Sequence, residues 1–263
     1  MKAAVLGKPI LHSLSPAIHT AGYQAQNLPH TYSAIEIAEN ELAAFVSNCD
    51  EQWLGLSLTM PLKVAAFSVA EELTPLVQLT GSINTLVFAD QIVAYNTDVY
   101  GIVRACQESE IGAAKTCSIL GSGATARSAI VAAHELGVQQ IHLVARNPEA
   151  ILVCDEIATE LGITFQATSA DNAQCWESDL VINTTPAGVA DTYLKPELTV
   201  SGLLLDVVYR PWPTVISSQW EDAGGRSCPG HLMLLHQAVA QYELFTGQSA
   251  PLKAMRAALE ASL

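Results

Sequence analysis

The sequence predicts an α/β protein built from two units, and three observations lead to this expectation. Segments typical of strands alternate with segments typical of helices along all 263 residues, which indicates largely parallel sheets covered by helices. Hydrophobic residues make up 50% of the chain, enough for a large core, and the length allows two ordinary domains or one large one. A fresh series of strands and helices begins near Ala114, so we place the boundary between the units within residues 100–113.

The first unit follows from short apolar or alternating runs separated by helical segments. Strands are expected at residues 2–7, 30–37, 53–59, 83–88 and 92–96. Helices are expected at residues 15–26, 39–49 and 98–109. The strands at 83–88 and 92–96 are separated only by Ala89-Asp90-Gln91, so we expect them to be neighbours. Asp98 opens the last of these helices.

The second unit shows the same alternation. Strands are expected at residues 116–120, 140–145, 163–167, 179–183 and 203–208, and helices at residues 125–136 and 148–161. Two closing helices are expected at 232–247 and 251–262. Because the second unit already looks complete by Gly230, we expect these helices to pack back on the first. The predicted domains are therefore 1–101 with 231–263, and 102–230.

Charge and cysteine content narrow the class of protein. The chain carries 12 Lys and Arg against 26 Asp and Glu, a formal net charge of -14, which disfavours nucleic acid and anionic membranes as partners. None of the six cysteines lies in a CxxC pair, so we expect no metal site and a reducing compartment. The opening MKAAVLGKPI is too soon broken by Gly and Pro for a signal peptide, and no apolar run would span a bilayer. A cytoplasmic protein is expected.

A glycine-rich stretch, SILGSGATARSA, lies between a predicted strand and a predicted helix. It contains the pattern GxGxxA, with Gly121, Ser122, Gly123, Ala124, Thr125 and Ala126 in order. Gly121 would permit a tight turn, Gly123 would let the backbone approach a pyrophosphate, and the helix N-terminus would present free N–H groups. This context predicts a Rossmann-type dinucleotide site; the alternative is a glycine-rich turn that holds no ligand.

The next strand ends at Ala145-Arg146-Asn147, where cofactor preference is set in such folds. An NAD site usually has Asp or Glu near this point, to accept from the ribose 2′-hydroxyl. Arg146 instead suits a 2′-phosphate, because a guanidinium only donates. The residue favours NADP, although an arginine at a strand end is also common on protein surfaces.

The stretch HSLSPAIH places two serines before a predicted helix. Ser15 followed by Pro16 is typical of an N-cap with proline at the first helical position, which leaves Ser13 unexplained. Lys63, just after a strand end, and Asp98 could share proton transfer to a substrate oxygen. The spacing of Lys63 and Asp98, taken alone, is more typical of an ordinary surface lysine and a helix cap than of a catalytic pair.

Eight motifs in order resemble the shikimate dehydrogenase family, nearly from end to end. They are GKPILHSLSPAIH, GLSLTMPLK, GSINTL, YNTDVYG, LGSGATARSA, INTTPAG, DVVYRPWPT and GHLMLLHQAVAQYELFTG. The resemblance implies an N-terminal substrate domain completed by C-terminal helices, a Rossmann-type NADP domain, and a cleft between them. It also implies reversible NADPH-dependent reduction of 3-dehydroshikimate to shikimate, on the route to chorismate and the aromatic amino acids.

The resemblance assigns roles to individual residues. It implies that Lys63 and Asp98 are the catalytic pair, and that Ser13 and Ser15 donate to the substrate carboxylate. Further contacts to the substrate are implied for Thr59, Lys63, Asn84, Asp98, Tyr209 and Gln237. Contacts to the cofactor are implied for Gly121, Ser122, Gly123, Ala124, Thr125, Ala145, Arg146, Asn147, Val207 and Gly230, the last two at the nicotinamide end.

The chain also departs from the family pattern, and alternatives stay open. Ser57 stands where the family often has Asn, and Ala145 and Asn147 replace the usual neighbours of Arg146, so NADP affinity is expected to be modest. One alternative is a quinate/shikimate dehydrogenase using NAD, against which Ser15 and Arg146 speak. Others are a dinucleotide-binding sensor without turnover and a paralogue acting on another polyol acid. The expected partner is a small-molecule substrate, and the chain is expected to be a monomer or homodimer.

Overall fold

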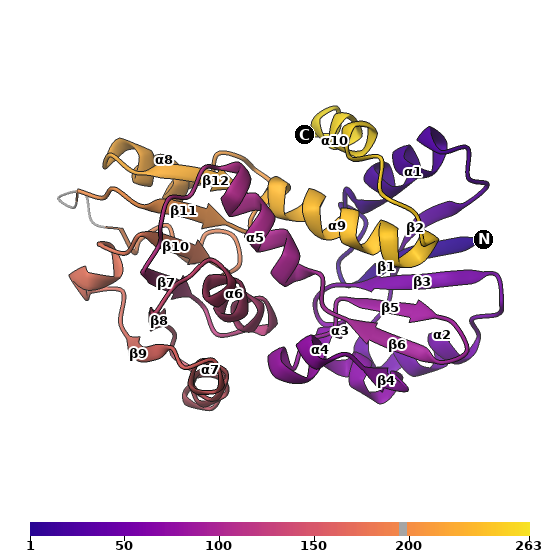
Figure 1. Cartoon of the computed structure of the whole chain (residues 1–263), viewed down its shortest axis with the longest axis horizontal. Coiled ribbons are helices and arrows are strands. Elements are labelled where there is room, and N and C mark those ends of the chain that lie inside the picture. The colour runs from indigo at the N-terminus through magenta and orange to yellow at the C-terminus, as the bar shows by residue number, and fades with distance from the viewer. Residues whose placement is uncertain (195–198) are drawn as a thin grey trace. The chain divides into compact units, whose positions relative to one another are not determined.

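The computed structural model describes residues 1–194 and 199–263. Its internal contacts divide the chain into two compact units, which Figure 1 shows in indigo to magenta and in magenta to orange, with the yellow C-terminus returning to the first. Unit 1 comprises Met1–Thr97 and Leu234–Leu263, and unit 2 comprises Asp98–Met233. Both are α/β units, as predicted.

The sheet of unit 1 is mixed. Its order is β2 (Thr31–Glu36), β1 (Lys2–Gly7), β3 (Trp53–Leu58), β5 (Thr85–Phe88), β6 (Ile92–Tyr95) and β4 (Glu72–Leu73). The pairs β1/β2, β1/β3 and β4/β6 are parallel, whereas β3/β5 and β5/β6 are antiparallel. Parallel pairs therefore dominate the sheet, as expected, and β5 is the one strand of this sheet that runs against its neighbours. The three residues between β5 and β6 are too few for a crossover, so they close a hairpin.

Helices cover the sheet of unit 1. They are α1 (Ser15–Ala25), η1 (Glu39–Glu41), α2 (Leu42–Ser47), α3 (Leu62–Ala65), η2 (Ala66–Ser68), α4 (Pro75–Thr80), α10 (Leu252–Glu260) and the later part of α9 (Gly230–Thr246). The terminal helices α1 and α10 lie side by side (Figure 1), so the C-terminus completes this unit. A Cβ on Gly22 of α1 would lie 2.8 Å from the Tyr242 ring of α9. The sequence did not predict α3, α4 or β4, which are too short to show a period.

Unit 2 contains a six-stranded, fully parallel sheet. Its order is β12 (Arg226–Pro229), β11 (Leu203–Asp206), β10 (Leu180–Asn183), β7 (Thr116–Leu120), β8 (Gln140–Val144) and β9 (Thr164–Thr168). Numbered from β7, this is the order 3-2-1-4-5-6 of the Rossmann fold. The strand order reverses between β7 and β10, and ligands of such sheets bind at that point.

Helices also cover this second sheet, as the composition of its central strands requires. All four residues of β10 and of β11 are buried, which is typical of parallel strands enclosed on both faces. The helices are α5 (Asp98–Glu108), α6 (Ala124–Glu135), α7 (Pro148–Glu160) and α8 (Val215–Asp222), with a short η3 (Ala173–Cys175). Helix α6 contacts α5 and α7, while α8 contacts β11 and β12. The sequence did not predict α8 or β12.

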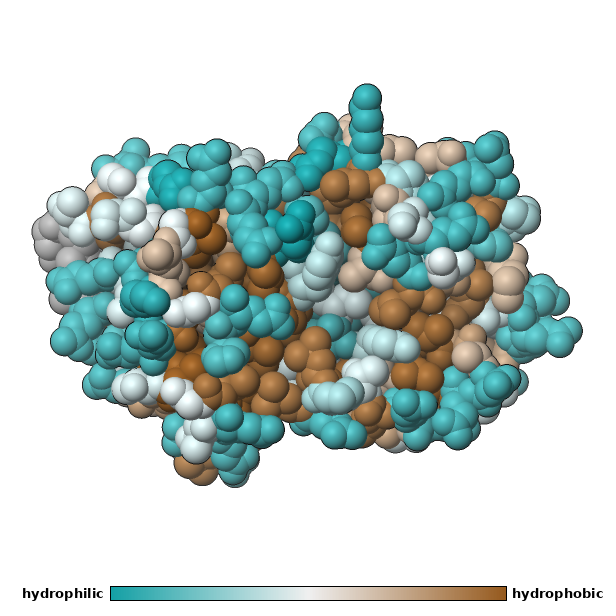
Figure 2. Space-filling model, viewed as in Figure 1, coloured by the Kyte–Doolittle hydropathy of each residue, from teal (hydrophilic) through white to brown (hydrophobic). Residues whose placement is uncertain are grey.

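The outer surface of both units is mixed in polarity. On the face drawn in Figure 2, hydrophilic residues surround several hydrophobic patches on each unit. Within the described parts of the chain, no helix has the length and apolar character needed to cross a membrane.

Candidate active site

In unit 1, the carboxyl ends of β1 and β3 lie close together. A Cβ on Gly7 would lie 2.5 Å from Cγ2 of Thr59, so only glycine fits there. The Thr59 N–H donates to the Leu6 carbonyl at 3.0 Å, and the Lys8 N–H to the Met60 carbonyl at 3.0 Å. These bonds fix Thr59 beside the start of the loop that carries Ser13 and leads to Ser15.

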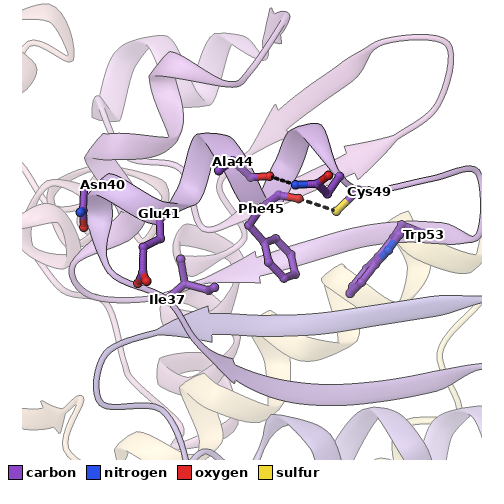
Figure 3. Close-up of a pocket in the computed structure, with 8 residues that line it drawn as sticks. Ile37, Asn40, Glu41, Ala44, Phe45, Cys49 and Trp53 are labelled. Carbon is purple, nitrogen blue, oxygen red and sulfur yellow. Dashed lines mark hydrogen bonds between the residues drawn. The ribbon is translucent and has the colours of Figure 1, made fainter.

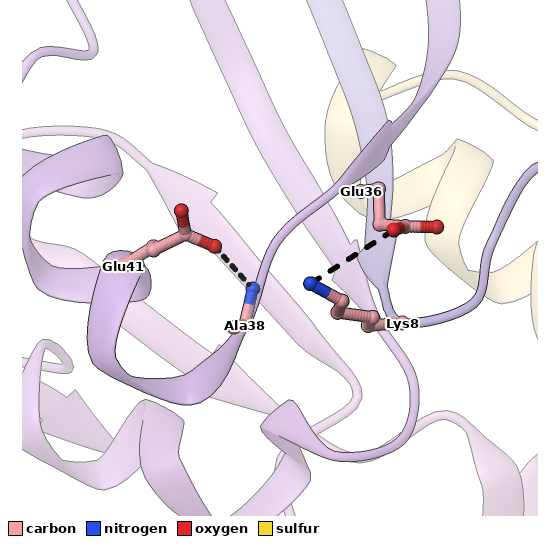
Figure 4. Close-up of polar contacts among 4 residues, drawn as sticks. All are labelled: Lys8, Glu36, Ala38 and Glu41. Atoms are coloured by element: carbon pink, nitrogen blue, oxygen red, sulfur yellow. Dashed lines mark hydrogen bonds and ion pairs between the residues drawn. The ribbon is translucent and has the colours of Figure 1, made fainter.

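Charged side chains border this strand edge (Figure 4). Lys8 Nζ lies 4.0 Å from Glu36 Oε1, and the two side chains are 54% and 40% exposed. Glu41 accepts from the Ala38 N–H at 2.8 Å and so ties down the turn after β2. Exposed ion pairs contribute little stability, so the edge is held mainly by its backbone hydrogen bonds.

Ser15 does not have the role that its position before Pro16 predicts. Helix α1 begins at Ser15, its N-cap residue is Leu14, and no side chain caps it. The prediction that Ser15 is the N-cap is wrong, and Pro16 is accordingly the second helical residue. A residue inside the first turn has helical dihedrals, so its hydroxyl cannot reach the N–H groups that a cap satisfies. Ser13 Oγ instead accepts from the Ser15 N–H at 3.3 Å, and Ser15 is buried.

Backbone hydrogen bonds bring Lys63 and Asn84 to the same end of β3. The Ile83 N–H donates to the Lys63 carbonyl at 2.9 Å, and the Leu58 N–H to the Asn84 carbonyl at 2.7 Å. Asn84 is only 2% exposed. With Thr59, these residues supply a hydroxyl, an ammonium and an amide around one strand end, a donor-rich set suited to a polyol acid.

The remaining predicted substrate residues lie on other elements. Gln237 lies on α9 in unit 1, is mostly buried, and donates to the Leu234 carbonyl at 2.8 Å. Asp98 is the first residue of α5, where the helix dipole favours a carboxylate, and it is buried. Tyr209 follows β11, and burial raises the pKa of its phenol, opposed by Arg210. Asp98 and Tyr209 both belong to unit 2.

Gly121 lies at the switch point of the parallel sheet and has a conformation that requires glycine. Its φ is +102°, and a Cβ there would lie 2.7 Å from Thr184 Oγ1. The Gly121 N–H donates to the Val144 carbonyl, and Thr184 donates through N–H and Oγ1 to the Leu120 carbonyl. The loops after β7 and β10 are thereby held against each other.

Gly123 is different, because nothing in the protein itself requires it to be glycine. It is the N-cap of α6, no side chain caps that helix, and a Cβ would meet no atom within 4 Å. Its φ of -81° is open to any residue. The twelve-residue helix therefore begins with uncapped N–H groups beside open space, which is the arrangement that binds phosphate. Ser122, Ala124 and Thr125 flank this space, and the chain fits a dinucleotide here.

The loop after β8 contains three residues predicted to contact the cofactor, and their environments differ. Ala145 is half-buried and Arg146 is exposed directly after the strand. Asn147 is the N-cap of α7, where its Oδ1 accepts from the N–H groups of Glu149 and Ala150 at 3.0 and 3.3 Å. Its side-chain oxygen thus serves the helix, a role that Pro148 after it also favours.

Val207, which directly follows β11, lies next to Gly230, which directly follows β12. A Cβ on Gly230 would lie 2.5 Å from the Val207 carbonyl, so glycine lets the start of α9 approach the strand. The Val207 N–H donates to the Asn183 carbonyl at 3.0 Å.

Sequence reasoning missed a buried polar cluster beneath Val207. Asp206 accepts from Asn183 Nδ2 at 3.0 Å, from the Val208 N–H at 3.1 Å and from Thr214 Oγ1 at 2.7 Å. Burial raises the pKa of this carboxyl, opposed by the Thr214 hydroxyl. The signal available in the sequence was a polar residue ending each of two apolar strands, Asn183 after LVI and Asp206 after LLL.

A separate hollow lies over α2 (Figure 3). Phe45, Cys49 and Trp53 form its apolar side, and Asn40 and Glu41 border it. Its lining includes none of the predicted site residues. In the described segments 1–194 and 199–263, no group of three or more His, Cys, Asp or Glu side chains could hold a metal ion.

The fold and site define a two-unit α/β protein with a Rossmann dinucleotide unit. Residues 5–86 match the shikimate dehydrogenase substrate binding domain, and residues 230–260 match the shikimate 5'-dehydrogenase C-terminal domain. Residues 105–209 match the ornithine cyclodeaminase/mu-crystallin family.

Individual relatives span the whole chain. A shikimate dehydrogenase (NADP(+)) of Methanococcoides burtonii is 32% identical, covering 96% of this chain and 95% of the relative. The crystal structure of Mycobacterium tuberculosis shikimate dehydrogenase is 41% identical, with a TM-score of 0.91 and 99% of each chain covered. That of the Thermus thermophilus enzyme, in complex with NADP(H) and shikimate, is 26% identical, with a TM-score of 0.87 and full coverage of both chains. This chain belongs to the shikimate dehydrogenase family.

Proposed function

We propose that this chain is an NADP-dependent shikimate dehydrogenase, which reversibly reduces 3-dehydroshikimate to shikimate in chorismate and aromatic amino acid biosynthesis. The observation that carries the proposal is the full-length likeness to relatives that bear this name. The uncapped N-terminus of α6 beside Gly123 agrees with it, because that geometry suits the pyrophosphate of a dinucleotide.

Unit 1 is proposed to bind the substrate, and unit 2 the cofactor. Ser13 and Ser15 would donate to the substrate carboxylate, and Thr59, Asn84, Tyr209 and Gln237 would bond the ring hydroxyls or carboxylate. In unit 2, Gly121 to Thr125 would hold the pyrophosphate, Ala145 to Asn147 would surround the 2′-phosphate, and Val207 with Gly230 would line the nicotinamide end. Bound NADP supplies the hydride acceptor.

Lys63 and Asp98 are proposed to move the proton. In shikimate oxidation, the hydroxyl proton must leave as the carbon loses its hydride. A neutral Lys63 amine or the Asp98 carboxylate would accept the proton at that oxygen, and the protonated group would return it in the reverse reaction. No step needs a metal, so a chelator should leave the rate unchanged.

The decisive experiment is a spectrophotometric assay of shikimate and quinate, each with NADP and with NAD. We expect turnover of shikimate with NADP to exceed the other three combinations. Faster turnover of quinate with NAD would instead support the quinate/shikimate dehydrogenase alternative, which Ser15 and Arg146 disfavour. Absence of cofactor reduction in folded protein would leave a dinucleotide-binding sensor.

The setting of the enzyme is also a proposal. We expect a cytoplasmic monomer or homodimer with a small-molecule substrate and no nucleic-acid or membrane partner, because the net charge of -14 repels anionic polymers and lipids. Light scattering of the purified chain would give its oligomeric state.

A further inference from the structure

A second layer of buried side chains lies next to the proposed substrate residues of unit 1. Gln241 follows Gln237 by one turn of α9, and Ser57 of β3 precedes Thr59, the residue directly after that strand, by two positions. These spacings place the members of each pair on one face of their element. Gln241 is 1% exposed, and Ser57, Thr85 and Tyr32 are buried too.

These side chains form one continuous chain of hydrogen bonds. Tyr32 Oη donates to Ser57 Oγ at 2.6 Å, and Ser57 Oγ donates to Gln241 Oε1 at 2.7 Å. Gln241 Nε2 donates to Thr85 Oγ1 at 2.9 Å and to the Asn84 carbonyl at 3.2 Å. Thr85 Oγ1 then donates to Asn84 Oδ1 at 2.8 Å. This series of hydrogen bonds therefore links β2, β3, α9 and the start of β5.

Backbone groups decide the orientation of the Gln241 and Asn84 side-chain amides in this series of hydrogen bonds. The Asn84 carbonyl can only accept, so the NH₂ group of Gln241 must face it. The Thr97 N–H can only donate, and it lies 2.8 Å from Asn84 Oδ1, so that oxygen must face Thr97. Asn84 Nδ2 then donates to Thr97 Oγ1 at 2.8 Å. The orientation of the proposed substrate-binding amide is thus set from inside the protein.

We propose that Gln241 is a positioning residue, whose amide, held by Ser57, fixes Asn84 and the Thr97 backbone directly before Asp98. The inference rests on the proposed function, because Asn84 and Asp98 are assigned their roles there. It also accounts for the departure at Ser57: a hydroxyl is short enough to accept from Tyr32 and to donate to Gln241 at once.

The test compares Gln241→Met, which keeps the volume and removes the amide, with Tyr32→Phe, which removes only the outermost hydroxyl. Misplacement of a substrate-binding group costs up to roughly 100-fold, so we expect Gln241→Met to lower kcat/KM for shikimate by roughly 10- to 100-fold. The KM for NADP should not change. Tyr32→Phe should lose stability but keep kcat/KM near that of the unaltered chain. Equal losses in the two variants, or none in Gln241→Met, would refute a positioning role.

A second readout does not depend on turnover. The Thr97 amide hydrogen is protected by its bond to Asn84 Oδ1, so its exchange with solvent, measured by NMR, should accelerate at least about 10-fold in Gln241→Met and stay unchanged in Tyr32→Phe. Unchanged exchange in Gln241→Met would overturn the proposal even in an active enzyme. If the unaltered chain does not oxidise shikimate, the proposed function fails while the exchange result still decides the positioning. Thr85→Val, which removes the next hydroxyl in the chain, should accelerate Thr97 exchange as well and serves if Gln241→Met does not fold.

Discussion

Lys63 lies on a four-residue helix, α3, directly after the cis-proline loop at the end of β3. Its carbonyl is tied to Ile83, so its backbone position is fixed while its side chain is only partly buried. A lysine placed in this way can act on a substrate without being part of the core. Its contribution should therefore appear in turnover and not in folding.

We expect Lys63→Ala to lower kcat by about 10²- to 10⁴-fold, the usual worth of general acid–base catalysis. The KM for shikimate should change much less, and circular dichroism should show an unaltered fold. Steady-state kinetics against shikimate and NADP measure both constants. A raised KM with an unchanged kcat would mean that Lys63 only binds substrate.

Arg146 is exposed directly after β8, free of the helix-capping role that its neighbour Asn147 has. If it binds the 2′-phosphate, Arg146→Ala should raise the KM for NADP and leave that for NAD nearly unchanged. A charge-assisted contact is worth a factor of about 10 to 100, and exposure favours the lower part of that range. The measurement is kcat/KM for both cofactors.

Arg146→Asp should weaken NADP further and improve NAD, because a carboxylate repels the phosphate and accepts from a 2′-hydroxyl. Equal losses with both cofactors would contradict the assignment and shift attention to Arg127. That arginine lies on α6, the helix that follows the glycine-rich loop, which makes it the next residue to test.

At the scale of elements, the start of α1 separates a structural role from a binding role. Because Ser15 lies inside the first turn and caps nothing, Ser15→Ala should leave the melting temperature unchanged. Loss of a hydrogen bond to a charged carboxylate should raise the KM for shikimate about 10- to 100-fold. Differential scanning calorimetry and kinetics test the two halves. A lower melting temperature with an unchanged KM would show that the serine matters only to the helix.

The start of α7 should behave in the opposite way. Asn147 accepts two helical N–H bonds, so Asn147→Ala should cost about 1 kcal/mol and lower the melting temperature by about 2–4 °C. Asn147→Asp keeps the acceptor and is the matched control, which should stay near the original stability. The KM for NADP should change little in Asn147→Ala, whereas the carboxylate of Asn147→Asp should raise it by repelling the proposed 2′-phosphate. A large rise in that KM in Asn147→Ala would show that the Asn147 side chain itself contacts the cofactor.

For the whole molecule, stability at acid pH should depend in part on the buried imidazole of His19. His19 stacks on Tyr32 with ring centroids 4.1 Å apart. Burial lowers the pKa of His19 from 6.5 to about 3, while the Gln241 side chain acts to raise it. Between pH 6.5 and about pH 3, His19 is protonated in the unfolded chain and neutral in the folded chain. The contribution of His19 to the free energy of unfolding should therefore fall with decreasing pH, by about 1.4 kcal/mol per pH unit, between pH 6.5 and about pH 3.

Urea unfolding between pH 7 and pH 4 measures this slope, with His19→Phe as the control that keeps an aromatic ring on Tyr32. The slope should be smaller in the variant by close to one proton. Asp206 contributes in the other direction, because its raised pKa favours the folded state as pH falls, and it is common to both proteins. Identical slopes would show that His19 does not control acid stability.

Some of this protein follows from local sequence alone. The strand at 116–120, the glycine pattern and the helix after it appear as β7, Gly121 with its positive φ, and α6. The pairing of strands at 83–88 and 92–96 also follows, because a three-residue connection leaves no other neighbour. In each case the deciding interactions lie within a few residues, so the local pattern carries them.

Other features were decided only by the tertiary structure. The sequence pattern does not distinguish the antiparallel β3/β5 pair from a parallel one, and it predicts Ser15 as the N-cap of α1, whereas Ser15 is the first helical residue and Leu14 is the N-cap. The series of hydrogen bonds from Tyr32 to Asn84 joins residues as far apart in sequence as Ser57 and Gln241, which are separated by 184 positions. A hydroxyl or amide has no preferred partner until folding buries it, and only then must a donor meet an acceptor, because leaving either unpaired would cost about 1–3 kcal/mol.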